Sequence, residues 1–403
     1  MRLHWTVWAV TAVALLGIVG CAAGSGDTSV GTAEPETGVG LVGQKEPPSL
    51  TYTEWRLPDN AMLQDHGDRF AVLLDNNFDD VGGVRIRLLD METGVHRVVV
   101  PDTLGRAESY LTLGLHCSDR WVVWEEIRGD EVADPLDVEW RLWAAPIDPV
   151  GTTVGPPALL RESVVSVRSR PLFDVVGDTL YVMSNTFPNP KQEGATYRSS
   201  IVSLGLGVGT EREIYTSDRM LHVFAVQDDE LIVTEYVDHD SKDCRIRVLG
   251  LDDGAERFAY EPGSRGISHW PAYSDGTLLW AADAGPAAPW PTLWCRRHDG
   301  TVLKVAEQGL DTAIVGPYVF YREYVTDRPT SGRGRESATI HGLELATLRS
   351  FELVRTAPAG EGYWQPMIDS HREEHTYVIW NQLFTADVGA DRGGTYVRRY
   401  HVP

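Results

Sequence analysis

Acidic and histidine side chains gather in two stretches of this chain, which are its most direct candidates for chemistry. Asp238, His239 and Asp240, followed by Asp243, combine carboxylate oxygens with an imidazole, donor types that metal ions use. A second stretch, residues 75–80, reads DNNFDD and is rich in oxygen donors. It lacks the spacing and the closing glutamate of a helical calcium loop. We interpret both stretches as solvated acidic loops, and we expect neither a bound metal nor a cofactor.

Signatures of catalysis are weak elsewhere. His116, His222 and His269 fall in predicted strands, but nothing in the order of residues pairs them with a serine or cysteine nucleophile. The chain has no Gly-x-Ser-x-Gly elbow, no phosphate-binding loop and no dinucleotide fingerprint. A catalytic site assembled from distant segments would leave no local motif. The sequence therefore favours a binding protein, and an enzyme remains the alternative.

A repeat supplies the framework that would position such residues. A polar turn followed by a short apolar run recurs about every fifty residues, which is the period of a β-propeller whose repeats are its blades. These apolar runs are apolar on both faces, as expected of strands covered on both sides by neighbouring blades. They lie at residues 68–75, 119–126, 177–185, 228–236, 275–283, 316–323 and 374–381.

Each repeat resolves into four strands, called a to d from the axis outward, and the apolar run is strand b. Strand a precedes it, at 61–67, 110–118, 171–177, 220–227, 267–274, 312–318 and 363–370. Strand c follows, at 84–90, 140–147, 200–206, 244–251, 292–298, 339–345 and 395–402. Strand d occurs six times, at 96–101, 158–162, 211–217, 256–261, 301–307 and 350–356. The segment 51–58 has d-strand character and no partner before it. We therefore predict an all-β, seven-bladed propeller in which 51–58 completes the last blade and closes the ring.

The repeat resembles that of bacterial propellers of the TolB and WD40-like kind, over residues 51–403. The resemblance is one of architecture. Neither a Trp-Asp dipeptide with its Gly-His partner nor a Tyr-Trp-Thr-Asp signature recurs at regular positions. The resemblance therefore implies a propeller body, and no site residue is carried over from the family.

The first residues predict where the protein works. Residues 1–20 have the charge and apolar plan of a signal peptide, too short for an ordinary membrane span. The residues from Ile18 to Cys21 resemble a bacterial lipobox, which implies lipid on Cys21. The alternative is cleavage by an ordinary signal peptidase beside an incidental cysteine. Residues 21–50 are rich in small and polar residues, which predicts a flexible tether. We expect a protein held by lipid on the extracytoplasmic face of a bacterial membrane.

The net charge bears on the class of partner, and the cysteine count bears on disulfide formation. The formal net charge is −22 and the isoelectric point about 4.9, so the body should repel the phosphates of nucleic acid. Cys117, Cys244 and Cys295 leave an odd number of thiols outside the cytoplasm. We favour three buried thiols, with a Cys244–Cys295 bridge as the alternative.

The face that holds the b–c and d–a connections is the predicted binding surface, because the b–c loops are long and functional groups gather on such loops. Aromatic residues and arginines are common anchors of binding surfaces, and arginines paired with surplus carboxylates are the alternative interpretation. The candidates are Arg106, Tyr110, Arg170, Arg219, Arg265, His269, Trp270, Tyr363 and Trp364. The predicted function is a membrane-tethered module that binds a protein, a glycan or a small molecule in the cell envelope. The alternative is an extracellular hydrolase or lyase with its site at the mouth of the central channel.

Overall fold

A computed structural model describes most of the body of the chain. The residues that it describes are 50–57, 61–76, 84–128, 138–150, 153–163, 170–186, 198–237, 243–263, 271–282, 290–325, 337–355, 367–370, 377–384 and 394–401. This described part contains no helix with the length and apolar character needed to span a bilayer.

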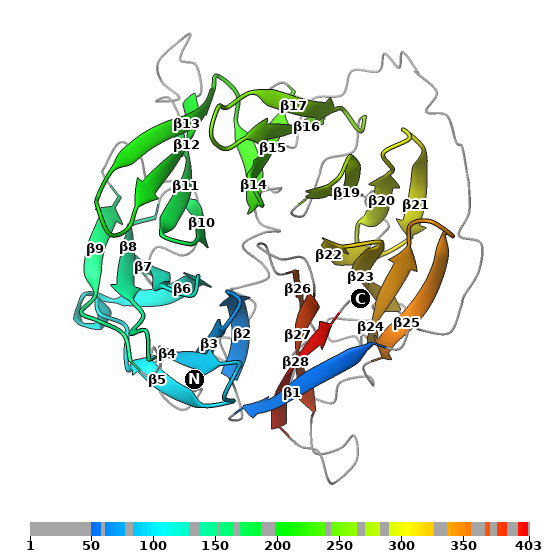
Figure 1. Ribbon diagram of the computed structural model, residues 1–403. Coiled ribbons are helices and arrows are strands. Elements are labelled where there is room, and N and C mark those ends of the chain that lie inside the picture. The colour runs from blue at the N-terminus through cyan, green and yellow to red at the C-terminus, as the bar shows by residue number, and fades with distance from the viewer. Residues whose placement is uncertain are drawn as a thin grey trace, which may run out of the picture.

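The described strands form seven four-stranded antiparallel sheets, arranged as blades around a central axis (Figure 1). Blade 1 contains β2 (Ala61–His66), β3 (Phe70–Asn76), β4 (Val84–Asp90) and β5 (His96–Val100). Blade 2 contains β6 (Tyr110–Cys117), β7 (Trp121–Arg128), β8 (Trp140–Pro146) and β9 (Ala158–Glu162). Blade 3 contains β10 (Leu172–Val176), β11 (Thr179–Thr186), β12 (Arg198–Gly205) and β13 (Glu211–Ser217).

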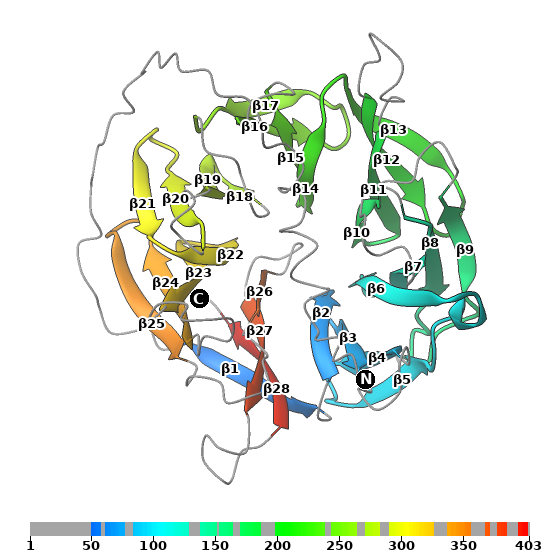
Figure 2. The same ribbon diagram turned by 180° about the vertical axis from the view of Figure 1, so that it is seen from behind.

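The remaining blades have the same order from the axis outward, which is also visible from behind (Figure 2). Blade 4 contains β14 (Leu221–Gln227), β15 (Glu230–Tyr236), β16 (Cys244–Gly250) and β17 (Glu256–Tyr260). Blade 5 contains β18 (Ala272–Ser274), β19 (Thr277–Ala282), β20 (Thr292–Arg296) and β21 (Val302–Ala306). Blade 6 contains β22 (Gly309–Val315), β23 (Tyr318–Val325), β24 (Ser337–Glu344) and β25 (Arg349–Arg355).

Blade 7 closes the ring. It contains β26 (Met367–Ser370), β27 (Tyr377–Phe384) and β28 (Gly394–His401), and its outermost strand is β1 (Thr51–Leu57) from the other end of the body. Seven residue pairs join β1 to β28, from Thr51 with His401 to Leu57 with Thr395. The predicted seven-bladed fold with its closing N-terminal strand is confirmed. Closure covers an edge of β28 that would otherwise be open to pairing with another chain.

Burial follows strand position in the blade, because strand b is covered by both neighbouring blades whereas strand d meets solvent. Every residue of β19 is buried, whereas β13 has no buried residue. In the six blades other than blade 7, the c–d pair contains a register shift, for example between Ile86 and Arg87. A bulge increases local twist, so the repeated shift lets each outer strand curl away from the blade.

Hydrogen bonds from turns join one blade to the next. Oδ1 of Asp119, in the a–b turn of blade 2, accepts from the backbone amides of Arg69 (2.9 Å) and Phe70 (3.1 Å) in blade 1. A Cβ atom at Gly67 would lie 2.4 Å from that oxygen, so the turn of blade 1 has room only for glycine. The hydroxyl of Ser118 in blade 2 donates to the carbonyl of Gly177 in blade 3 (2.7 Å). The polar turns that made the repeat visible therefore hold adjacent blades together.

The predicted strand bounds agree with the structure to within about three residues where both can be compared. Strand a of blade 6 was predicted at 312–318, but β22 lies at Gly309–Val315 and the a–b turn is at 316–317. Gly316 has φ +54° in this turn. The prediction was wrong because it continued strand a through Gly316 and Pro317, which form the turn.

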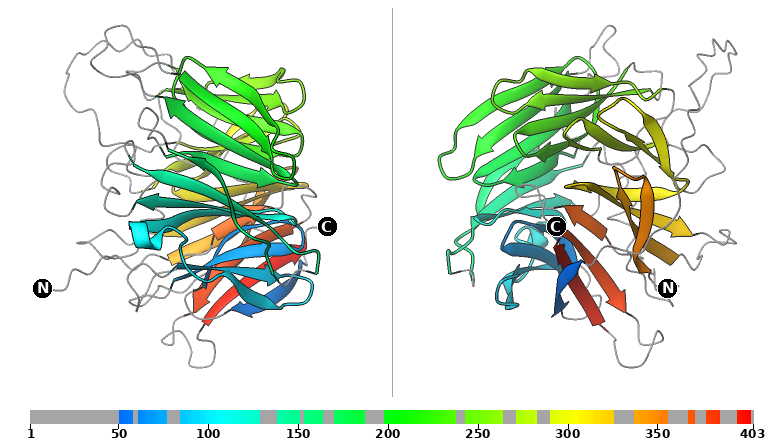
Figure 3. Two further views of the ribbon diagram at one scale, coloured as in Figure 1. Left: turned by 90° about the vertical axis from the view of Figure 1, so that its left-hand side faces the viewer. Right: turned by 45° about the vertical axis from the view of Figure 1, so that its right-hand side comes forward.

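The strands run between the two faces of the ring (Figure 3). One face has the b–c and d–a connections, including the short 3₁₀ helix η2 (Arg106–Glu108) between blades 1 and 2. The other face has the a–b and c–d turns. Because β1 is a d-position strand, it begins at Thr51 on the a–b/c–d face and ends at Leu57 on the b–c/d–a face.

Candidate functional site

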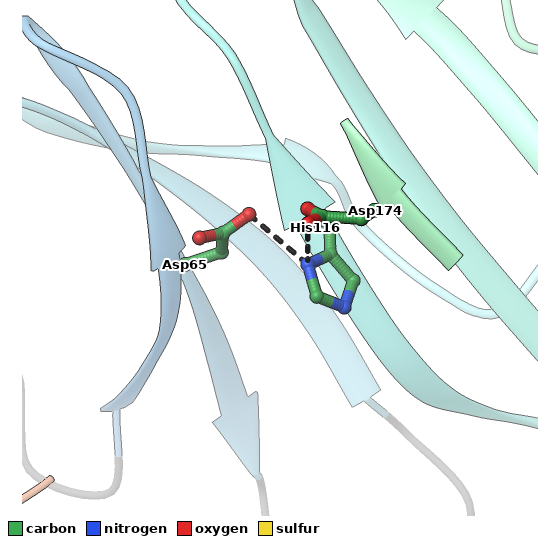
Figure 4. A group of neighbouring side chains, drawn as sticks. All are labelled: Asp65, His116 and Asp174. Atoms are coloured by element: carbon green, nitrogen blue, oxygen red, sulfur yellow. Dashed lines mark hydrogen bonds and ion pairs between the residues drawn. The ribbon is translucent and has the colours of Figure 1, made fainter. Parts of the chain in front are cut away.

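Three side chains from the innermost strands of blades 1, 2 and 3 converge on one another (Figure 4). Asp65 comes from β2, His116 from β6 and Asp174 from β10. Nδ1 of His116 lies 3.1 Å from Oδ2 of Asp65 and 3.8 Å from Oδ1 of Asp174. The two carboxylate side chains are 3% and 7% exposed and the imidazole is 27% exposed. Two buried acids therefore face one partly accessible imidazole nitrogen.

The strands place these three residues at one equivalent position. Asp65 pairs with Val72, His116 with Val123 and Asp174 with Tyr181, in each case the third residue of strand b. Blades 4, 5 and 6 have alanine at this position, and blade 7 has aspartate. These residues are Ala225, Ala272, Ala313 and Asp369. The inner ring is therefore polar in one run of adjacent blades and apolar in the other.

The two aspartates also join neighbouring blades. Oδ2 of Asp65 accepts from the amide of Cys117 (3.0 Å), and Oδ2 of Asp174 accepts from the amide of Val226 (3.4 Å). Oε1 of Gln227 accepts in the same way from the amide of Tyr273 (3.2 Å). Each of these bonds joins one innermost strand to the next. Such bonds fix the carboxylates in place, and they also give the aspartates a structural role.

A buried ion pair lies behind His116. Oε2 of Glu125, on β7, accepts from Nε of Arg170 at 2.6 Å, and the glutamate side chain is fully buried. Burial raises the pKa of Glu125, and the positive charges of Arg170 and His116 offset part of that effect. Among the described residues, Oε1 of Glu125 has no hydrogen-bond partner. The cluster thus contains a third carboxyl group whose proton affinity is increased.

The innermost strand of blade 2 is shaped around this glutamate. The β6–β7 register shifts between Thr112 and Leu115. Gly114 lies within this shift, and a Cβ atom there would lie 3.0 Å from the Phe173 ring and 3.3 Å from Oε2 of Glu125. Phe173 in turn packs edge-on against His116, with ring centroids 4.9 Å apart. A side chain at position 114 would therefore disturb both the glutamate and the ring that supports the imidazole.

Buried or partly buried polar side chains near the ends of b strands hold the connections on the b–c/d–a face. Glu126, at 0% exposure, accepts from the amides of Leu104 (2.6 Å) and Gly105 (2.9 Å) in the connection that contains η2. Asn185 in blade 3 bonds both backbone groups of Leu221, the first residue of β14. Glu235 in blade 4 accepts from Ser217 (3.1 Å) at the end of β13. Side chains of the b strands therefore hold these connections in place through hydrogen bonds.

The residues predicted as ligand-binding have individual environments. Arg106, in η2, forms an exposed ion pair with Asp102 (2.7 Å). Tyr110 is 6% exposed, and the Arg141 guanidinium lies 4.3 Å from its ring centroid. Burial raises the pKa of this tyrosine.

Two further candidates lie beside blades 3 and 4. Arg170 precedes β10 and belongs to the buried pair with Glu125. Arg219 is partly exposed before β14, and its amide donates to the Ser217 hydroxyl (3.1 Å). The structure therefore brings Arg170, alone of these four, to the cluster around His116.

Several predictions fall on residues outside the described part of the chain. These are Cys21, Arg265, His269, Trp270, Tyr363, Trp364 and the Asp238–Asp240 stretch. Of the other acidic stretch, Asp75 is described and forms an ion pair with Arg87 (2.6 Å). The three other cysteines, Cys117, Cys244 and Cys295, are buried and form no disulfide, which confirms the preferred interpretation and makes the Cys244–Cys295 bridge wrong.

The sequence analysis did not identify Asp65, Asp174 or Glu125 as candidates, because it considered each predicted strand by itself. His116 was noted, but it was tested only against serine and cysteine partners. Alignment of the innermost strands by their pairing to strand b would have placed Asp65, His116 and Asp174 in one row. This alignment can be made by counting residues, because each of the three lies seven positions before its partner in strand b, and the register shifts in β2 and β6 lie N-terminal to Asp65 and His116.

No protein-family model matches the chain, and no curated protein matches it in sequence. Among solved structures it is similar to an oligogalacturonate lyase from Vibrio parahaemolyticus, with 9% identity and a TM-score of 0.46 over 88% of this chain and 97% of that one. The β-propeller domain of the Trilobed protease from Pyrococcus furiosus is 13% identical, with a TM-score of 0.46 over 81% of this chain and 90% of that one. That domain is described as having an open velcro topology, whereas here β1 closes the ring.

An acylaminoacyl peptidase from Pyrococcus horikoshii is 13% identical, with a TM-score of 0.49 over 80% of this chain. The match spans 50% of that peptidase's length. Likenesses of this size transfer no activity to this chain. The assignment of the fold rests on the seven sheets themselves, and they make this protein a closed seven-bladed β-propeller.

Proposed function

We propose that this protein is a lipid-anchored, extracytoplasmic propeller that acts as a binding module in the cell envelope. Lipid on Cys21 holds it to the membrane, residues 22–50 form the tether, and the b–c/d–a face meets the partner. The partner is a protein, a glycan or a small molecule of the envelope.

The direction of β1 is the observation that carries this proposal. The body begins at Thr51 on the a–b/c–d face, opposite His401. A tether attached at Thr51 therefore joins the body on the a–b/c–d face, and we expect this face to lie toward the membrane. A flexible segment of the length of residues 22–50 has a root-mean-square span of about 30 Å. The face with the long loops then points away from the membrane, where an envelope partner can reach it.

The held connections on that face support a role in binding. Glu126 fixes the d–a connection before β6, and Asn185 and Glu235 together fix the one between β13 and β14, through partly buried hydrogen bonds. Connections that are already ordered lose less conformational entropy when a partner docks. Two d–a connections are therefore held in place before a partner binds.

Fractionation of cells tests the anchor. Cys21→Ala should move the protein from the membrane fraction to the soluble fraction, because the lipid attachment site is lost. Cys244→Ala, which changes a buried thiol of the body, is the matched control and should stay with the membrane. Membrane retention of the Cys21→Ala variant would contradict the proposal.

Capture from detergent-solubilised membranes tests the binding face. The full chain is immobilised, and envelope components that it retains are compared with those retained by an Arg106→Glu variant. Arg106 lies exposed on η2, so its reversal should weaken capture without unfolding the body. Arg97→Glu on the exposed outer strand β5 is the control. Equal capture by the wild type and both variants would place the binding surface elsewhere.

The His116 cluster favours a second function, a hydrolase or lyase that acts on sugars or peptides at the channel mouth. An imidazole 3.1 Å from a carboxylate is an arrangement used in general acid–base catalysis. Glu125, whose pKa is raised by burial, would be the companion acid. Assays on panels of oligosaccharides and peptides should then show turnover that is lost in Glu125→Gln. Turnover that persists in this variant would exclude the cluster as the active site.

A further inference from the structure

We propose that Asp65, His116 and Asp174 form a binding site for one divalent transition-metal ion on the inner wall of blades 1 to 3. This inference does not depend on the proposed function, since an anchor or a binding face requires no metal. It gives a specific role to the polar run of the inner ring.

Geometry supports the site first. Each residue offers one donor atom, and the three donor atoms lie within 4.8 Å of one another. Bonds of about 2.0–2.2 Å from an ion to nitrogen and oxygen ligands place the donors of one site roughly 3 to 3.5 Å apart. The observed separations from Nδ1 of His116 are 3.1 and 3.8 Å. Small side-chain rotations would therefore bring all three donors to ligand distance.

The donor set defines the class of ion. One imidazole nitrogen and two carboxylate oxygens suit Zn²⁺ or Mn²⁺, because imidazole favours transition metals. Ca²⁺ takes six to eight oxygen ligands, and Mg²⁺ requires near-octahedral oxygen coordination, so both fit less well. Three protein ligands leave at least one position for water, as in open metal sites.

Electrostatics favours a cation at this place. Both aspartates face the same ring nitrogen, and a proton on Nδ1 points along one direction at a time (Figure 4). Ionised carboxylates held close together in a buried site repel each other. A divalent cation between them would remove that repulsion and interact with both at once.

The surroundings supply a rigid and polar supporting layer. Phe173 packs against the His116 ring at 4.9 Å, and the amides of Cys117 and Val226 orient the two carboxylates. Glu125 is buried, forms an ion pair with Arg170 and has an Oε1 atom that lacks a hydrogen-bond partner among the described residues. Groups that orient ligands in this way are a usual part of metal sites.

The blade-to-blade hydrogen bonds of Asp65 and Asp174 suggest a competing interpretation. In it, the cluster is structural, and hydrogen bonds alone hold the three side chains together. Asparagine separates the two interpretations. Its side-chain oxygen still accepts from the backbone amide, but it is a poorer metal ligand than a carboxylate. Asp65→Asn and Asp174→Asn should therefore keep the fold and lose metal affinity.

Titration calorimetry on the full chain, purified in detergent and stripped with a chelator, is the direct test. Zn²⁺, Mn²⁺ and Mg²⁺ are added separately. We expect one equivalent of Zn²⁺ or Mn²⁺ to bind, with Mg²⁺ weaker. Each aspartate variant should lose roughly 10- to 100-fold in affinity, and His116→Ala should lose at least as much. His222→Ala on β14, a half-buried imidazole bonded to Tyr236, is the matched control and should bind normally.

Cobalt spectroscopy and thermal melting supply independent readouts. Co²⁺ should give visible ligand-field absorption in the wild type and in His222→Ala but not in Asp174→Asn. Bound metal should raise the melting temperature of the wild type by mass action and leave the variants unchanged. Absence of stoichiometric binding, or binding that all the variants retain, would overturn the proposal. If His116→Ala fails to fold, the two asparagine variants decide the outcome.

Discussion

Trp55 of β1 pairs in register with Val397 of β28, and both side chains lie in one buried cluster with residues of blade 1. The first and last strands of the body are thus joined to each other and to the next blade. An ion pair between Glu54 and Arg398, 344 positions apart, crosses the same seam. Ring closure therefore depends on side-chain packing as well as on the backbone ladder.

Trp55→Ala should lower the free energy of unfolding by about 3–5 kcal/mol, the usual loss for a buried tryptophan. Trp55 is 7% exposed, whereas Tyr52 on the same strand is 51% exposed. Tyr52→Ala is therefore the control and should cost less than about 1 kcal/mol. Urea unfolding of the two variants measures the difference. Equal midpoints would mean that β1 contributes little to closure.

Deletion of residues 51–57 should destabilise the body far more than deletion of 24–45. The first deletion removes a whole strand and exposes the edge of β28. The second shortens the predicted tether only. Thermal melting of the two deletions checks the prediction, and equal melting temperatures would refute the structural role of the strand.

Arg170→Met should destabilise the protein by about 3–5 kcal/mol at pH 7, because it leaves the buried Glu125 without its partner. Burial already raises the pKa of Glu125. Between the pKa of Glu125 in the unfolded chain and its higher pKa in the native protein, the native protein holds a proton that the unfolded chain has released. The free energy of unfolding therefore falls as pH rises through this range. Loss of Arg170 raises the native pKa further. The variant should therefore be less impaired at pH 5 than at pH 7.

Urea unfolding at the two pH values tests this sign. Arg120→Met removes the guanidinium of an exposed pair with Asp178 and should change stability by less than about 1 kcal/mol at both. Adding Glu125→Gln to Arg170→Met should restore part of the loss at pH 7. A greater loss at pH 5 would contradict the assigned role of the glutamate.

Gly342→Ala should destabilise blade 6. Gly342 pairs with Phe351 across β24 and β25, and a Cβ atom there would lie 2.1 Å from the phenylalanine ring. Overpacking of this kind costs about 1–3 kcal/mol or more. Gly207 has nothing within 4 Å of an added Cβ atom, so Gly207→Ala is a neutral control. Similar melting temperatures for the two variants would show that Phe351 can move aside.

The thiols of Cys117, Cys244 and Cys295 should resist alkylation in the native protein. All three are buried, and burial raises the pKa of Cys295 to about 12, so little reactive thiolate forms at pH 8. Mass spectrometry after treatment with iodoacetamide should find none of the three modified before unfolding and all three afterwards. Rapid native labelling at Cys295 would contradict its burial.

Much of the fold could be predicted from the sequence because each blade repeats one chemical plan. The apolar b strands are buried on both faces, and the polar turns bond to the neighbouring blade, as Asp119 does. Both features act locally and recur, so they are visible in a single chain. The missing seventh d strand gave the position of the seam before any pairing was known.

The candidate site could not be predicted in the same way, because its members belong to different blades. Asp65, His116 and Asp174 each lie seven residues before their partner in strand b, so the repeat gives their equivalence, but it does not show that the three side chains meet. Glu125 reads as part of an apolar run, and only burial beside Arg170 makes its proton affinity unusual. Spacing along the chain identifies equivalent positions in different blades, but it does not show which side chains are in contact.

The pairing of Thr51 with His401 also means that the ring needs no particular starting point. A circular permutant joined at that pair and opened at the exposed turn around Val208 would trace the same seven blades. This turn, like Thr51, lies on the a–b/c–d face. A tether moved there would attach to a different blade, but the same face of the ring would still lie toward the membrane. The blade to which the tether is attached can therefore vary, whereas the face to which it is attached is set by the direction of the strands.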